Sequence, residues 1–407
     1  MAQYGARTSV LRRKLETIGR FFQAPRQSYF LFGPRGTGKS TWLRAAYPDA
    51  LWIDLLEPEI ARSLAARPER LSELVLAQPV DRVVVIDEVQ RAPALLAVAH
   101  ALIERRPGSR FVLTGSSARK LKRTGVDLLG GRAVVRTLHP FLAGELGSRF
   151  DLDSALRDGL LPLALAAPVP RDVLRAYAAL YLREEVQLEG LVRNVGAFAR
   201  FLEAASFAHG AVLNVAEVAR ECSVERKVVS GYIDVLEDLL LAFRLFPFTR
   251  RARRASSAHP KLYLFDAGVY RALRPSGPLD RDSELAGAAL EGLVAQHLRA
   301  WIEYRQEGDN LSFWRTRSGA EVDFIVYGPS GFWAIEVKHG IRVDAADVRA
   351  LRTFVADYPE CRPLLVHRGR DRAVVGGVPC IPCGEFLERI DPRQSLDAAM
   401  AMPSDHR

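Results

Sequence analysis

Short apolar runs alternate with helix-length segments over the first third of the chain. The runs fall at residues 29–32, 51–54, 83–87, 111–114 and 133–136. Continuous apolar strands of this kind, separated by helices, are typical of a parallel sheet that is buried on both faces. The pattern therefore predicts an α/β domain over residues 1–140.

The pattern changes twice in the middle of the chain. Residues 141–208 mix apolar and charged positions with helical spacing, which predicts a helical lid or linker. Residues 209–255 have the pattern of a short strand, a helix, a turn and a second helix. This is helix-turn-helix spacing, and it predicts a winged-helix segment. The basic run Arg250–Arg254 lies at its end.

A second α/β domain is predicted over residues 256–390. Residues 286–304 have the pattern of a helix, and strand patterns follow at 311–314, 320–327, 332–338 and 363–367. Residues 391–407 are polar and rich in alanine, so a disordered tail is expected there.

Composition narrows the class of protein. The chain has 407 residues, of which 48% are hydrophobic and 26% charged, and this length allows several separate cores. No apolar stretch reaches the roughly 18 residues that span a membrane, and the basic N-terminus lacks the apolar run of a secretory signal. We therefore expect a cytoplasmic protein with no membrane partner. The formal charge of +9 favours a polyanionic partner such as nucleic acid.

The four cysteines are too few for a disulfide scaffold, which agrees with a reducing compartment. Cys380 and Cys383 have the CxxC spacing of half a zinc site or of a redox pair. No second CxxC and no nearby histidine completes a zinc ligand set in the sequence, so zinc is disfavoured.

A glycine-rich segment follows the first predicted strand and opens a helix. Its sequence, GPRGTGKS over residues 33–40, has the spacing of a Walker A loop. In such a loop, backbone N–H groups surround the phosphates, a lysine reaches the β and γ oxygens, and a serine hydroxyl ligates magnesium. ATP and Mg²⁺ are therefore the predicted ligands. The residues expected to bind them are Gly33, Gly36, Thr37, Gly38, Lys39, Ser40 and Thr41.

Asp87 and Glu88 come directly after the apolar residues 83–86. A carboxylate pair at the carboxyl end of a buried strand is the arrangement of a Walker B motif. Asp87 is expected to hold magnesium through water, and Glu88 to polarise the attacking water. A chance similarity is disfavoured because both motifs occur in the expected order. The acidic pair and the long appended domains also argue against a metabolic P-loop kinase.

Two further features near this site each have two interpretations. Thr114 ends a strand pattern, and Ser116 lies two residues further on. Both are expected to touch the γ-phosphate or the attacking water, although Ser and Thr also commonly end strands. Arg132 follows a Gly-Gly pair and is either an arginine finger for a neighbour's nucleotide or a surface arginine. The finger role requires a homo-oligomer.

Charged and apolar residues alternate strictly on the first arm of a predicted hairpin near the C-terminus. In an extended strand, side chains at every second position share a face. We therefore expect Glu321 and Asp323 on one face of this arm. The opposite face is expected to carry Val322, Phe324 and Val326.

The turn-type residues 328–331 reverse the chain into the second arm, which carries Glu336 and Lys338 on one face. The hairpin can therefore bring Asp323, Glu336 and Lys338 together as catalytic groups. They would supply two carboxylates for an oxygen-binding cation and a lysine that orients or deprotonates water. Glu291, on the preceding helix, is the candidate third carboxylate, so the predicted metal set is Glu291, Asp323 and Glu336.

This D-x12-E-x-K spacing is weak when taken alone, because Glu and Lys are common on solvated strand faces. Its placement on both arms of one hairpin, behind an acidic helix, favours a metal-dependent nuclease core of the PD-(D/E)xK type. Folds of this sort are often reused for binding, so cleavage and binding both remain open.

The order of motifs resembles that of a prokaryotic family of AAA-type ATPases with a C-terminal domain of unknown function 4143. The matching stretches, spread over residues 8–390, are 33–41, 85–90, 113–117, 131–132, 289–294, 321–324 and 335–338. The resemblance implies an AAA core, a helical lid, a winged-helix segment and a restriction-endonuclease-like C-terminal domain. Every motif residue is present, so nothing marks either site as inactive. The resemblance implies no substrate.

Two functions of different classes are compatible with these features. In the first, the chain is an ATP-driven DNA-processing enzyme whose winged helix and Arg250–Arg254 hold DNA phosphates while the C-terminal site cuts or grips the strand. In the second, it is an ATP-dependent switch whose C-terminal domain only binds nucleic acid or protein, and the winged helix packs between domains. Salt-sensitive DNA binding that is lost when the arginines are neutralised would favour the first.

Overall fold

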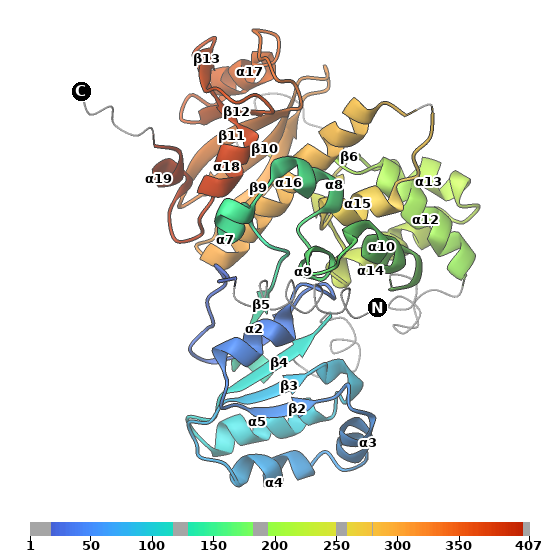
Figure 1. Cartoon of the computed structure of the whole chain (residues 1–407), viewed down its shortest axis with the longest axis vertical. Helices are drawn as coiled ribbons and strands as arrows, with labels where there is room; N and C mark the ends of the chain where they lie inside the picture. Colours follow the sequence, from blue (N-terminus) through green and yellow to red (C-terminus); the bar gives the residue numbers. More distant parts are fainter. Residues whose placement is uncertain (1–17, 117–128, 182–193, 250–258, 279, 402–407) are drawn as a thin grey trace.

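The structure is a computed structural model that describes residues 18–116, 129–181, 194–249, 259–278 and 280–401. Its described strands form sheets of five, six and three strands. Figure 1 shows the five-stranded sheet at one end of an elongated molecule and the six-stranded sheet at the other, with a mainly helical region between and beside them.

The N-terminal sheet is wholly parallel and has the strand order β2-β3-β4-β1-β5. Its strands are β1 (Ser28–Phe32), β2 (Leu51–Asp54), β3 (Val84–Asp87), β4 (Phe111–Gly115) and β5 (Ala133–Thr137). Along β1, Phe30 and Phe32 pack into one core, and Tyr29 and Leu31 into another. The sheet is therefore buried on both faces, as its continuous apolar runs predict, and it is consistent with a P-loop AAA-like core.

Helices cover both faces of this sheet. α2 (Lys39–Ala46) packs Leu43 into the core that contains Tyr29, whereas α4 and α5 pack Leu71 and Leu96 into the core that contains Phe30. The elements on that second side and at the strand ends are α3 (Pro58–Ala66), α4 (Arg70–Leu76), η1 (Val89–Arg91), α5 (Leu95–Arg105) and η2 (Leu129–Gly131).

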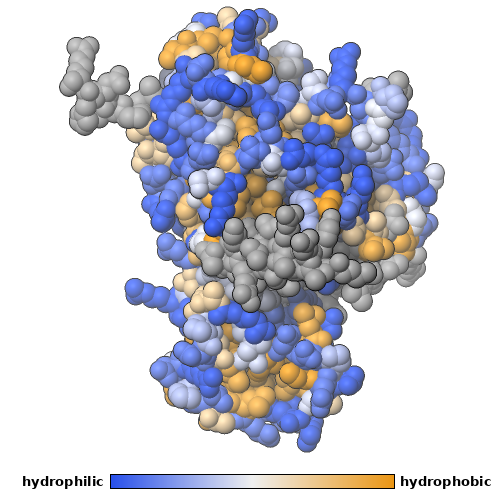
Figure 2. Space-filling view, in the orientation of Figure 1, coloured by the Kyte–Doolittle hydropathy of each residue, from blue (hydrophilic) through white to orange (hydrophobic). Residues whose placement is uncertain are grey.

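Part of the surface of this unit is apolar. Figure 2 shows apolar side chains low on the molecule, over the unit that contains the five-stranded sheet. Large apolar residues that are exposed in this unit include Leu56, Ile60, Leu74, Leu76 and Val80. Apolar patches that stay exposed often mark interaction surfaces.

Residues 141–208 are helical where the structure describes them, as expected. Their elements are α7 (Ala143–Leu146), η3 (Gly147–Arg149), α8 (Leu152–Asp158), α9 (Pro162–Leu165), α10 (Pro170–Ala176), η4 (Tyr177–Tyr181) and α12 (Val195–Phe207). The side chain of Asp151 accepts a hydrogen bond from the N–H of Ser154, and Pro162 and Pro170 each occupy the first position of a helix. These local signals explain where α8, α9 and α10 begin.

The next segment contains three helices and a small antiparallel sheet. The elements are β6 (Ala211–Val212), α13 (Val215–Glu221), α14 (Arg226–Asp238), β7 (Ala242–Leu245), β8 (Lys261–Leu264) and α15 (Ala267–Leu273). Asn214 caps α13, because its Oδ1 accepts from the N–H groups of Ala216 and Glu217. β8 pairs with both β6 and β7, so the boundary expected at residue 255 divides this sheet.

The six-stranded sheet has the order β13-β14-β12-β11-β10-β9. One face packs against α16 and α18, and α17 covers the other face. The C-terminal elements are α16 (Asp282–Arg305), β9 (Asn310–Arg315), β10 (Glu321–Gly328), β11 (Gly331–Lys338), α17 (Arg349–Asp357), β12 (Arg362–His367), β13 (Ala373–Val375), β14 (Val378–Pro382), α18 (Cys383–Arg389) and α19 (Leu396–Met400). The predicted hairpin is present, since β10 and β11 pair as far as Gly328 opposite Gly331.

The predicted face of Val322 on β10 is wrong. Phe324 and Val326 pack toward α16, but Val322 packs with Ile325 into the core under α17. The register with β9 shifts between Val322 and Ile325. A bulge of this kind inserts one extra residue and interrupts the strict alternation of side chains, which a period-2 rule cannot foresee.

The expected disordered tail is also wrong where the structure describes it. α19 lies within residues 391–401, and Leu396 is buried in the main core. The indole N–H of Trp333 donates to Oδ1 of Asp397 at 2.9 Å, which ties this end of the chain to β11. The polar composition of this segment gives no sign that Leu396 is buried, because its burial depends on tertiary packing.

Candidate functional site

The loop between β1 and α2 has the backbone geometry of an anion site. Gly36 and Gly38 have φ angles of 86° and 88°, in the left-handed region that favours glycine. A Cβ added at Gly33 would lie 2.5 Å from the carbonyl oxygen of Leu138, so no side chain fits there. Because α2 begins at Lys39, the free N–H groups of its first turn lie next to the loop.

Lys39 is buried inside this loop. Its Nζ donates hydrogen bonds to the carbonyl oxygens of Gly33 and Pro34, at 2.7 and 3.2 Å. Thr37 is also buried, and its hydroxyl donates to the carbonyl oxygen of Pro34 at 2.9 Å. Thr41 is exposed on α2. The ammonium group is thus held within the loop that would surround a phosphate.

Ser40, Asp87 and Thr114 form one hydrogen-bonded set across three elements. The Ser40 hydroxyl donates to Oδ2 of Asp87 at 2.7 Å, and the Thr114 hydroxyl donates to Oδ1 of the same carboxylate. Asp87 ends β3 and Thr114 is the last residue but one of β4, and these strands are neighbours in the parallel sheet. Thr114 therefore holds the carboxylate of Asp87, and its expected contact with the γ-phosphate stays a prediction.

Glu88 has a backbone φ of 59°, which is uncommon for a residue with a side chain. Its N–H donates to the Thr114 hydroxyl at 3.2 Å, and its carboxylate accepts a hydrogen bond from the Gln90 amide. Strained backbone of this kind concentrates at functional sites. The turn holds the Glu88 carboxylate just beyond the end of β3.

Ser116 follows β4 at the same edge of the sheet and is 6% exposed. Its buried hydroxyl has no hydrogen-bond partner among the residues that the structure describes. An unsatisfied hydroxyl beside an anion site is well suited to contact a ligand. The expected contact of Ser116 with the γ-phosphate or the attacking water stays a prediction, and the unsatisfied hydroxyl is compatible with it.

Arg132 lies at the opposite edge of the sheet. It directly precedes β5, and β5 begins opposite Ser28 at the amino end of β1. Its guanidinium donates to Glu104 and to the carbonyl oxygen of Gly130. Arg132 is thus distant from the chain's own loop, so a finger role can only concern the nucleotide of a neighbouring chain.

Sequence reasoning missed Arg20. Its buried guanidinium donates to the carbonyl oxygen of Thr37 at 3.1 Å and pairs with Glu145 at 3.2 Å. Burial lowers the pKa of Arg20, but Glu145 and Tyr304 more than offset this effect, so the pKa is raised overall. A single arginine in a basic N-terminal stretch gives no signal in the sequence, because its partners are far away along the chain.

The helical segment after the AAA-like core contacts the loop directly. The N–H of Leu163 donates to the carbonyl oxygen of Gly36 at 3.1 Å, and the Tyr177 hydroxyl donates to that of Arg35 at 3.2 Å. A Cβ at Gly36 would lie 2.8 Å from the Cβ of Leu163. A change in the shape of the loop would therefore displace α9, which contains Leu163.

The carboxyl end of α16 packs against the same nucleotide-binding unit. Nε2 of His139, just beyond β5, lies 2.8 Å from Oε2 of Glu303. The backbone N–H of His139 donates to the Tyr304 hydroxyl at 3.1 Å, and the Tyr304 ring lies edge-on to Phe22.

The other predicted site lies where β10 and β11 part. Oδ2 of Asp323 accepts from the N–H of Val337 at 2.9 Å, and Nζ of Lys338 lies 2.7 Å from Oε1 of Glu336. Glu291, on α16, interacts electrostatically with both Asp323 and Glu336. The structure therefore brings together Glu291, Asp323, Glu336 and Lys338 as the sequence predicts.

Sequence reasoning missed a lysine at the centre of this group. Nζ of Lys261, on β8, lies 3.0 Å from Glu291, 2.5 Å from Glu321 and 3.5 Å from Asp323. The Lys261 side chain is 2% exposed. We call Glu291, Glu321, Asp323 and Glu336 the carboxylate cluster. The only sequence signal was a lysine in an apolar strand pattern, which does not reveal its partners.

Burial shapes the ionisation of this cluster. It raises the pKa of Glu291 and of Glu336, and the nearby charge of Asp323 raises both further. Burial alone lowers the pKa of Lys261, but the carboxylates of Glu291, Asp323 and Glu321 outweigh it and raise that pKa overall. Lys261 is therefore charged, and its ammonium group offsets the negative charge of the carboxylates around it.

The described residues contain no group of three or more His, Cys, Asp or Glu side chains arranged to hold a metal ion. The predicted metal set Glu291, Asp323 and Glu336 is thus close in space, but it does not have the arrangement of a metal site. The CxxC pair does not form a site either. Cys380 packs into the core under α17 and Cys383 into the core beside α16, on opposite faces of the sheet.

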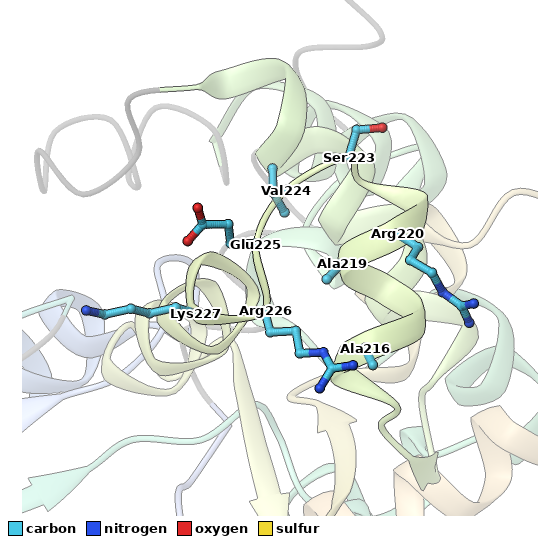
Figure 3. Close-up of a pocket in the computed structure, with 8 residues that line it drawn as sticks. All are labelled: Ala216, Ala219, Arg220, Ser223, Val224, Glu225, Arg226 and Lys227. Atoms are coloured by element: carbon cyan, nitrogen blue, oxygen red, sulfur yellow. The ribbon is translucent and has the colours of Figure 1, made fainter.

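The turn between α13 and α14 forms an open, basic groove, which Figure 3 shows in close-up. The Arg226 side chain lies between the two helices, while Arg220 and Lys227 point to opposite sides. The basic run Arg250–Arg254 lies outside the described residues. In the part of the chain that the structure describes, no helix has the length and apolar character needed to cross a membrane.

Comparisons with known proteins find relatives that align with most of the chain. Two relatives, the uncharacterized proteins Mb2031c of Mycobacterium bovis and Rv2008c of Mycobacterium tuberculosis, are each 27% identical to this chain over 370 residues. The alignment covers 88% of this chain and 80% of each relative.

Family models match three consecutive parts of the chain. Residues 149–280 match a domain of unknown function numbered 8612. The model matched by residues 25–147 is that of an AAA domain, which indicates a nucleotide-binding ATPase. The family models thus place an AAA domain at residues 25–147 and a domain of unknown function 4143 at residues 286–386.

Proposed function

We propose that this chain hydrolyses ATP and uses the energy to control a nuclease-like C-terminal domain that acts on DNA. The observation that carries this proposal is that α16 contacts both the carboxylate cluster and the nucleotide-binding unit. It presents Glu291 to the carboxylate cluster, and Glu303 and Tyr304 near its end contact His139 of the nucleotide-binding unit. At a helical rise of about 1.5 Å per residue, Glu291 and Glu303 are roughly 18 Å apart.

The ATP site assigns a role to each described residue. Lys39 would leave the carbonyl oxygens of its loop for the β and γ phosphate oxygens, and the glycine loop would surround the phosphates with N–H groups. Ser40 and Asp87 already point at each other, so they fit as the residues that would hold Mg²⁺. Magnesium, when bound, would neutralise charge that develops on the phosphates.

Hydrolysis needs a base beside the attacking water. Glu88 is placed for this by the hydrogen bond from its N–H to Thr114, while its carboxylate accepts from Gln90. Release of Glu88 from Gln90 when ATP binds would let it orient water toward the γ-phosphate. Ser116 would contribute its unsatisfied hydroxyl to the same end of the phosphate chain.

The arrangement of charged residues in the C-terminal domain supports a core of the PD-(D/E)xK type. Asp323 and Glu336 stand on adjacent strands, Lys338 follows on the same strand, and a glutamate comes from the preceding helix. Carboxylate oxygens are the donors that Mg²⁺ prefers. The fit of a metal ion is incomplete because Lys261 lies among these carboxylates.

DNA contact is proposed at the basic groove between α13 and α14. Arg226 and Lys227 stand in the first turn of α14, where a helix-turn-helix presents its second helix to DNA. Arg250–Arg254 would add phosphate contacts.

The deciding experiment is a magnesium-dependent cleavage assay on linear, circular and single-stranded DNA, with and without ATP. Cutting that is abolished by both Asp323→Ala and Glu336→Ala, while ATP hydrolysis persists, supports a nuclease under ATP control. Glu360→Ala, on an exposed loop of the same domain, is the matched control and should change neither DNA cleavage nor ATP hydrolysis. Cutting that survives both substitutions contradicts the proposal.

A second function is favoured by one observation. Lys261 occupies the centre of the carboxylate cluster, which is what a domain that binds without cutting would tolerate. In that case the chain is an ATP-dependent switch whose C-terminal domain grips nucleic acid or protein. Salt-sensitive DNA binding with no cutting under any condition would select this second function.

A further inference from the structure

We propose that Lys261 is an intramolecular cation that keeps divalent metal out of the carboxylate cluster, and that metal binds only when Lys261 withdraws. The proposal rests on the cation site of the proposed function and adds its regulation.

The contacts place the Lys261 ammonium where a shared ligand would lie. It is within 3.5 Å of carboxylate oxygens from both α16 and β10. The Tyr263 hydroxyl, two residues further along β8, donates to the same Oε1 of Glu291 at 2.6 Å. One strand thus supplies both the cation and a hydrogen bond to the cluster.

A second observation points to a missing ligand. Oε2 of Glu336 is buried and has no hydrogen-bond partner among the described residues, although the residue is only 5% exposed. Its other oxygen pairs with Lys338. A buried carboxylate oxygen without a partner is costly, so a group that reached it would stabilise the site.

The charges favour exchange of Lys261 for a divalent ion. Among the described residues, three cationic side chains, Lys261, Lys338 and Arg315, pair with the four carboxyl groups of the cluster. A divalent ion in place of Lys261 would bring twice its positive charge to the same oxygens. The lysine and the metal therefore compete for the same electrostatic position.

We call the contact of Lys261 with the carboxylate cluster the latch, and it joins two separate sheets. Lys261 belongs to the three-stranded sheet beside α14, whereas Glu321 and Asp323 belong to the six-stranded sheet. A shift of β8 relative to β10 would carry the ammonium away from the carboxylates. Events at the α13–α14 segment could in this way open the metal site.

The test is a Mn²⁺ titration of the nucleotide-free full-length protein, followed by calorimetry and by electron paramagnetic resonance. Lys261→Met should bind Mn²⁺ roughly tenfold or more tightly than the wild type, a coupling typical of linked sites. Adding Asp323→Asn to Lys261→Met should abolish the gain. Arg62→Met, which removes an exposed cation from α3 of the N-terminal unit, is the matched control and should behave as the wild type.

Removing Lys261 leaves extra negative charge and can destabilise the fold. The double variant Lys261→Met/Glu321→Gln removes one charge of each sign, and it should show the same gain in Mn²⁺ affinity. Equal affinity in wild type and variants, or no binding in any of them, overturns the latch. DNA cleavage by a wild type that shows no gain from Lys261→Met would keep the nuclease function and remove only the latch. A gain without any cleavage would keep the latch and remove the nuclease function.

Discussion

The hydroxyl of Ser40 donates a hydrogen bond to Oδ2 of Asp87 at 2.7 Å, and so joins the first turn of α2 to the end of β3. The two residues are 47 positions apart in sequence. They meet because the glycine loop turns the chain back over the carboxyl edge of a parallel sheet. The nucleotide site therefore draws on residues from two distant parts of the chain.

Glu88→Gln should bind ATP normally and hydrolyse it roughly 100-fold more slowly, because the amide cannot accept a proton from water. Fluorescent nucleotide binding and phosphate release measure the two properties separately. Lys39→Ala is the contrasting variant and should lose binding as well. Normal hydrolysis by Glu88→Gln would exclude this residue as the base.

Thr114→Val keeps the volume of the buried side chain but removes the hydroxyl that holds Asp87. We expect a drop in kcat with little change in KM for ATP, since the loop itself is untouched. A lost hydrogen bond to a charged group costs about 1.5–3 kcal/mol, which corresponds to roughly 10- to 100-fold in rate. An equal fall in binding would instead assign Thr114 to ground-state contact with the nucleotide.

Gly33→Ala should abolish ATP binding, whereas Gly231→Ala should make the protein more stable. A Cβ at Gly33 meets the carbonyl oxygen of Leu138, so the loop must distort and ATP binding should be lost. Gly231 lies inside α14 with nothing within 4 Å of its Cβ position, so alanine there should stabilise the protein by about 1 kcal/mol. Thermal unfolding and nucleotide titration of both variants check the pair, and a stable, ATP-binding Gly33→Ala would contradict the expectation.

Arg132→Ala should leave ATP binding intact and lower hydrolysis only in an assembled oligomer. The reason is position, since Arg132 stands at the amino edge of β5 and the chain's own loop lies at the carboxyl edge. Mixing Arg132→Ala with Glu88→Gln should restore part of the activity, because some interfaces then pair an intact finger with an intact base. A monomer that hydrolyses ATP at full rate would remove the finger role.

Glu303→Gln should weaken the contact between α16 and the nucleotide-binding unit. Burial raises the pKa of Glu303, but Arg299 and His139 outweigh it, so the pKa is lowered overall from the ordinary 4.5. A lowered pKa stabilises the folded state above the unfolded pKa, and this stabilisation is lost as pH falls toward the folded pKa. The variant should therefore be less stable by roughly 1–3 kcal/mol at pH 7, with a smaller difference below pH 4.5.

Urea unfolding of both proteins between pH 3 and pH 7 measures this difference. Glu284→Gln, an exposed position at the start of the same helix, should leave stability unchanged throughout. A gap between wild type and Glu303→Gln that is constant down to pH 3 would show that the lost contact is not ionic.

The nucleotide site was predictable because its chemistry is local. The spacing of Gly33, Gly36, Gly38 and Lys39 is a property of one short loop, and an apolar run that ends in an acidic pair needs only a buried parallel strand around it. The same reasoning predicted the turn at 328–331 and the nearness of Asp323 to Glu336, since two adjacent arms of a hairpin must meet.

Tertiary structure alone decided the rest. A bulge in β10 reversed the expected face of Val322, and Arg20 acquired two of its partners, His139 and Glu145, from more than a hundred positions away. Lys261 reached the carboxylate cluster from a different sheet. Local patterns record backbone preference and the burial of each residue, but the partner of a buried charge depends on how separate sheets and helices pack, and no short stretch of sequence contains that information.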